Sequence, residues 1–156
     1  MAAPIHGPGM VGPGKRYKLA DTAQQLVGGF LLAGPFVVTE EVWVLAANMT
    51  FGHALVTVGI VVAIGYGALY EADADRDPER EPEVAGVPLR FVSLMGVSFG
   101  SVAILALAFT APETFLVQEG ILTDPTDRAL VETTLKAISV GAIFSVVGAA
   151  TADTVF

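Results

Sequence analysis

Four long apolar stretches constrain the fold of this chain more than any other feature. His53 to Tyr70 is 18 residues without a charge, and Leu89 to Thr110 has none after Arg90. A helix needs about 20 mainly apolar residues to cross a bilayer, and a mean hydropathy of +0.65 is too high for a soluble domain of 156 residues. The pattern predicts an all-α, multi-pass membrane protein with four transmembrane helices in two hairpins.

Proline, glycine and acidic residues within and between the stretches indicate the approximate boundaries of the helices. Pro35 is expected to kink the first helix near Leu31–Gly34. Gly and Pro make up about half of the first 14 residues, and seven acids and two prolines fill EADADRDPEREPE. We expect a flexible, cytoplasmic Gly/Pro-rich tail over 1–20, a membrane domain over 21–156, helices at about 22–48, 53–70, 89–110 and 126–152, and an acidic loop over 71–88.

Composition excludes several classes of function. The net charge is −8, from 16 acidic and 8 basic residues, which is unlike a nucleic-acid-binding protein and resembles a halophilic composition. The absence of Cys, with only two His, excludes thiolate and multi-histidine metal sites. No nucleophile–base pair stands out. We therefore expect no cofactor, no metal and no enzymatic activity.

The basic residues predict the orientation. Six lie in or beside the N-terminal tail and the acidic loop, namely Lys15, Arg16, Lys18, Arg76, Arg80 and Arg90, and two lie on the other side, namely Arg128 and Lys136. Because basic residues favour the cytoplasmic side, both termini and the acidic loop are expected in the cytoplasm of a cell-membrane protein.

Charged residues within the apolar stretches are the candidate functional residues. Glu40 and Glu41 fall in the outer half of the first helix, and Glu132, Lys136 and His53 fall at a similar depth, with Thr39 nearby. A charge inside a membrane helix is costly, about 2.5–3.5 kcal/mol on insertion scales. Three interpretations stay open: a proton- or cation-binding carboxylate pair, an ion pair with Lys136 that joins two helices, or a first helix that ends early and leaves the pair at the interface.

Small residues recur at helix-packing spacing on the last three helices. They are Gly59, Ala63, Gly67, Gly96, Gly100, Gly141 and Ser145. Such ridges let backbones approach closely, within one chain or between copies. Homo-oligomerisation is therefore expected. Trp43, the only Trp, is expected to anchor the first helix at the lipid interface.

The segment from Gly28 to Trp43 carries a family resemblance. A Gly-rich apolar run, a Pro and then Thr39-x-Glu41-x-Trp43 resemble the signature of an uncharacterised prokaryotic family of small integral-membrane proteins of unknown function. The resemblance implies that Glu41, rather than Glu40, is the family-type acid. It implies no activity.

Two functional hypotheses follow from these residues. The first is an oligomeric ion channel, or a proton- or cation-coupled transporter, in which Glu41 and Glu40 bind the ion and Lys136 with Glu132 tunes them. The second is a non-transporting subunit that docks beside a larger membrane complex through its small-residue faces. Membrane lipids are expected partners under either hypothesis.

Overall fold

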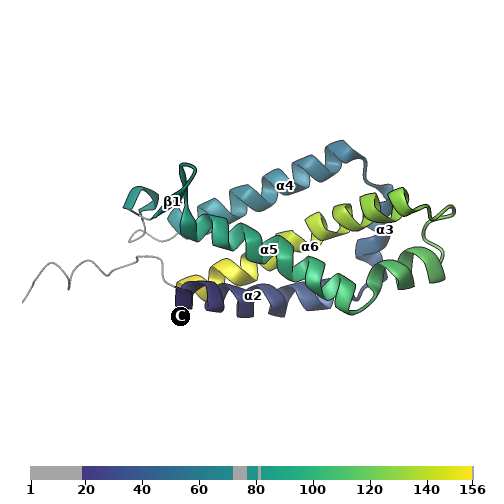
Figure 1. The fold of residues 1–156 in the computed structure, drawn as a ribbon, viewed down its shortest axis with the longest axis horizontal. Helices are drawn as coiled ribbons and strands as arrows, with labels where there is room; N and C mark the ends of the chain where they lie inside the picture. Colours follow the sequence, from purple (N-terminus) through teal and green to yellow (C-terminus); the bar gives the residue numbers. More distant parts are fainter. Residues whose placement is uncertain (1–18, 72–76, 81, 156) are drawn as a thin grey trace, which may run out of the picture.

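The computed structural model describes residues 19–71, 77–80 and 82–155, and these residues form a bundle of helices (Figure 1). The predicted all-α fold is confirmed. In chain order the helical elements are α2 (Leu19–Val37), α3 (Glu40–Asn48), α4 (Phe51–Tyr66), η2 (Gly67–Glu71), η3 (Pro78–Arg80), α5 (Leu89–Ala108), η4 (Pro112–Gln118) and α6 (Asp127–Val155). The first turn of α2 and the last turn of α6 lie at one end of the bundle, here called the terminal end, and α3 lies at the other.

Length and composition identify the candidate membrane spans. Three helical stretches qualify alone, Phe51–Tyr70, Leu89–Ala108 and Asp127–Val155. The pair α2 and α3 qualifies only together, and its two helices are bent by 81° at the break between them. The described part of the chain therefore holds three candidate spans, or four if this pair is one broken span.

The expectation of one continuous first helix over 22–48, kinked near Leu31–Gly34, is wrong. Pro35 lies inside α2, which continues to Val37, and the chain breaks just before Thr39. Thr39 has an extended backbone (φ −105°, ψ 136°), and its hydroxyl donates to the carbonyl oxygen of Phe36 at 2.9 Å. The backbone N–H of Thr39 also donates to this oxygen, at 3.3 Å, so the carbonyl of Phe36 at the end of α2 is satisfied where the chain turns after the proline.

The acidic segment contains more regular structure than a plain loop. β1 (Glu83–Val84) pairs antiparallel with β2 (Val87–Pro88). Ala85 and Gly86 both have positive φ (53° and 83°), as a two-residue type I′ turn requires. Residues 72–76 and 81 lie outside the described residues, as do 1–18 of the expected tail, while Leu19 and Ala20 already belong to α2.

Helix α6 runs through the centre of the bundle, and its closest neighbour is α2. A Cβ on Gly28 would collide with the carbonyl oxygen of Gly148 and would lie 2.8 Å from the Cβ of Ala152. Almost one turn away along α6, Ser145 donates to the carbonyl oxygen of Gly29 at 3.1 Å, and its Oγ lies 2.7 Å from that of Ser101. Backbone contact and hydrogen bonds therefore join α2, α5 and α6, as expected where lipid supplies no hydrophobic drive between helices.

Only part of the predicted small-residue set packs within the chain. Gly141 faces Val102, whose Cγ1 would lie 2.7 Å from an added Cβ, and Ser145 is buried. In contrast, an added Cβ would meet nothing within 4 Å at Gly59, Gly67, Gly96 or Gly100, and Ala63 is exposed. Packing inside one chain therefore does not explain these five residues. Their role between copies stays a prediction.

Candidate functional site

The two predicted carboxylates, Glu40 and Glu41, lie in the first turn of α3 at the break in the first span. Both are exposed, beside Val44 and Leu45. Neither forms an ion pair with any residue that the structure describes. A carboxylate in the first turn of a helix is favoured by the exposed backbone N–H groups, which carry partial positive charge.

The expected network of Glu41, Lys136, Glu132 and His53 does not assemble within the chain. Glu132 accepts a hydrogen bond from Nε of Arg128 at 2.8 Å instead. His53 caps the start of α4, where the hydroxyl of Thr50 and Nδ1 of His53 are 2.8 Å apart. The ion pair with Lys136 is therefore absent from the described residues, whereas the interpretation of the two carboxylates as a proton- or cation-binding pair stays a prediction. The early-ending helix is the interpretation that fits this geometry.

Trp43 is placed in the interior, which corrects the expected role at the lipid interface. Its ring is 1% exposed, stacks on Phe115 with ring centroids 6.0 Å apart, and donates Nε1–H to the carbonyl oxygen of Val37 at 3.0 Å. That carbonyl belongs to the last turn of α2, where no helical N–H follows to satisfy it. Trp43 and Thr39 therefore hold α3 at its angle to α2, on either side of Glu41.

Replacing Trp43 by Phe tests this role. The variant keeps an aromatic ring but removes the donor to Val37, leaving a buried carbonyl without this partner. We expect a loss of about 1–3 kcal/mol in the free energy of unfolding, the usual cost of such a group. Unfolding by sodium dodecyl sulfate in mixed micelles measures it. An unchanged midpoint would show that the hydrogen bond across the break does not stabilise the chain.

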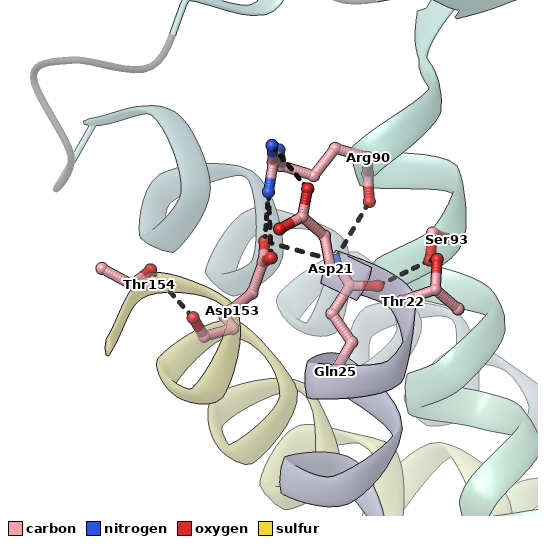
Figure 2. Close-up of polar contacts among 8 residues, drawn as sticks. Asp21, Thr22, Gln25, Arg90, Ser93, Asp153 and Thr154 are labelled. Atoms are coloured by element: carbon pink, nitrogen blue, oxygen red, sulfur yellow. Dashed lines mark hydrogen bonds and ion pairs between the residues drawn. The ribbon is translucent and has the colours of Figure 1, made fainter. Parts of the chain in front are cut away.

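A second polar site at the terminal end was missed by the sequence analysis (Figure 2). Arg90, 2% exposed, donates from Nη1 to both carboxylate oxygens of Asp153, at 2.9 and 3.0 Å. Its Nη2 lies 3.1 Å from Oδ2 of Asp21. The side chain of Asp153 is fully buried and that of Asp21 is 17% exposed. One guanidinium thus joins the start of α2, the start of α5 and the end of α6.

Neutral polar residues complete this site, which we call the terminal cluster. Its members are Asp21, Thr22, Gln25, Arg90, Ser93 and Asp153. Gln25, which is fully buried, donates from Nε2 to Oδ2 of Asp153 at 3.3 Å. Ser93 donates to Oε1 of Gln25 at 2.6 Å, and its hydroxyl lies 2.9 Å from that of Thr22 (Figure 2). Pairing of this kind is what makes buried charges tolerable at low dielectric. We therefore interpret the cluster as a structural site that joins the ends of three helices.

The sequence held a signal for this cluster. Asp21 and Gln25 are four residues apart, and Arg90 and Ser93 three apart, so each pair shares one face of its helix. In the sequence alone, Arg90 contributes only to the predicted orientation. The cluster lies at the terminal end of the bundle, whereas Glu40 and Glu41 belong to α3 at the opposite end (Figure 1).

Comparison with known proteins decides the family. A family model described as "Putative integral membrane protein (DUF2391)" matches residues 13–153. The chain belongs to this family. Membership of DUF2391 agrees with the candidate spans and makes the chain an integral membrane protein. No curated protein and no solved structure matches the chain.

Proposed function

We propose that this DUF2391 protein is an oligomeric cation-conducting membrane protein whose working carboxylates lie between copies of the chain. The observation that carries the proposal is the exposure of both Glu40 and Glu41, without a cationic partner among the described residues. Rings of acidic side chains are a common device for attracting cations to a pore. Glu41 and Glu40 would form such a ring near one membrane boundary.

The packing of the bundle favours an ion path between chains over an ion path through a single chain. The backbones of α2 and α6 touch at Gly28 and Gly148, and Ser101 and Ser145 bond beside that contact. Trp43 fixes the orientation of α3 from the buried side, so that its acidic first turn faces outward. A second copy placed against α3 would therefore bring two carboxylate pairs together.

A non-transporting subunit of a larger membrane complex is the second candidate. It is favoured by the open space beside Gly59, Gly67 and Gly96, where a foreign helix could approach the backbone. A stable larger complex on gentle purification, together with no ion flux from the pure protein, would support this candidate.

Neutralising both carboxylates tests the conducting role. In liposomes with a potassium gradient, the Glu40→Gln/Glu41→Gln double variant is expected to carry about tenfold less K⁺ flux than the native protein. The reason is that a ring of like charge raises the local cation concentration by about that factor or more. The matched control is Glu113→Gln/Glu119→Gln, which removes two other exposed carboxylates.

Two results would contradict the proposal. One is an unchanged K⁺ flux in the Glu40→Gln/Glu41→Gln variant, which would show that the carboxylates do not serve conduction. The other is the absence of any flux above that of empty liposomes, which would favour the non-transporting subunit.

A further inference from the structure

A groove of about 850 Å³ lies between α4, α5 and α6 near the α3 end of the bundle. Its walls are mainly apolar and include Leu55 and Val58 from α4, Phe99 and Ala103 from α5, and Leu135 from α6. A volume in this range is typical of sites for small organic ligands. The groove takes no part in the conducting site proposed above.

One wall of the groove carries charge. Arg128, Glu132 and Lys136 line it from successive turns of α6. Arg128 and Glu132 are paired at 2.8 Å, so their charges offset each other. Lys136 forms no ion pair with any described residue, although Glu132 lies one turn away on the same helix. The groove is therefore apolar with one net positive charge at its side.

The depth of Lys136 places this charge near the lipid headgroups. Lys136 precedes Asp153, in the terminal cluster, by 17 positions, and a helix crosses the hydrocarbon core in about 20 residues. Its ammonium can therefore reach the headgroup level by extending its stem along α6. Helix α4 begins at Phe51, and Leu55 and Val58 lie one and two turns further along it. These two side chains therefore line the part of the groove on the hydrocarbon side of the headgroups.

We propose that this groove binds an anionic phospholipid, with an acyl chain along the apolar walls and the phosphate against Lys136. The charge favours a lipid over a second copy of the chain. An apolar helix in the groove would enclose Lys136 without an opposite charge, which is costly in a membrane. A lipid phosphate supplies that charge, and its acyl chain matches the walls.

Native mass spectrometry of delipidated protein tests the proposal. Phosphatidylglycerol is compared with phosphatidylcholine carrying the same acyl chains. We expect the native protein to prefer phosphatidylglycerol about fivefold, the effect of one basic residue near a lipid surface. Lys136→Gln should abolish the preference, and Lys136→Arg should keep it. Gly100→Phe should block the groove, whereas Gly96→Phe, one turn away in open space outside the groove, should not.

Three outcomes would overturn the proposal. Equal retention of the two lipids would show that the charge of Lys136 does not select the lipid. Retention of lipid by Gly100→Phe at the native level would place the lipid elsewhere. Loss of the oligomer in Gly100→Phe, with lipid retained, would show that a second copy occupies the groove. None of these measurements depends on ion flux, so the lipid site and the conducting role can fail separately.

Discussion

Replacing Arg90 by Met is expected to destabilise the protein by about 3–5 kcal/mol, the usual cost of removing one partner from a buried ion pair. Asp153, whose side chain is fully buried, would lose two hydrogen bonds, and Asp21 would face it without an intervening cation. The measurement is the midpoint of unfolding by sodium dodecyl sulfate in mixed micelles. The unfolding midpoint of Arg90→Lys should lie between those of the native protein and Arg90→Met. An ammonium keeps the positive charge but lacks the planar guanidinium geometry that binds both oxygens.

The control for this variant is Arg128→Met. Arg128 also pairs with a carboxylate, but its side chain is 88% exposed, so no measurable change in the unfolding midpoint is expected. Adding Asp21→Asn and Asp153→Asn to Arg90→Met should recover part of the lost stability, because the unpaired charges disappear. Equal midpoints for native protein and Arg90→Met would mean that the terminal cluster does not hold the three helices together.

Replacing Gly28 by Leu is expected to destabilise the protein by about 3 kcal/mol, the upper end of the usual cost of overpacking. The obstacle is the carbonyl of Gly148, which belongs to a helix backbone and cannot move aside as a flexible side chain can. Helices α2 and α6 must therefore separate, and the hydrogen bond from Ser145 to Gly29 must stretch or break. The same detergent titration measures the change.

Gly96→Leu is the matched control for the packing variant. It adds the same side chain to a helical glycine in the same type of element, but an added Cβ there meets nothing within 4 Å. We expect an unchanged or higher midpoint for the monomer, because Gly is a poor helix residue. If the Gly28 and Gly96 variants unfold alike, close contact between α2 and α6 is not what stabilises the bundle.

Hydropathy and turn signals were sufficient to predict the all-α membrane fold. Apolar runs such as His53 to Tyr70 leave a helix as the spanning structure, since every backbone group bonds within it. The position of the break in the first span was not predicted. The sequence indicated a kink just before Pro35, whereas α2 continues past this residue to Val37. The turn depends on Thr39 and Trp43, whose donors satisfy carbonyls in α2, and such contacts follow from three-dimensional packing.

The sequence singles out the carboxylates of the candidate site but does not predict how they are arranged. Glu40 and Glu41 were identified because charge is rare in apolar stretches. Their separation from Lys136 depends on the 81° bend, which buries Val42 and Trp43 and turns the carboxylates outward. The terminal cluster was missed because Asp21, Arg90 and Asp153 sit at helix ends, where charge is ordinary. Only the packing of three helices reveals that they meet.

The distance between Glu41 residues of neighbouring copies is the measurement that tests the proposed arrangement most directly. The chain contains no Cys, so Glu41→Cys provides a single site for a spin label. Double electron–electron resonance in nanodiscs should then give a defined distance between labels, because Trp43 holds α3 in place and the proposed arrangement puts α3 against a second copy. A label on Glu113→Cys gives the comparison at the same end of the bundle. Absence of dipolar coupling at position 41 would contradict a carboxylate site between chains.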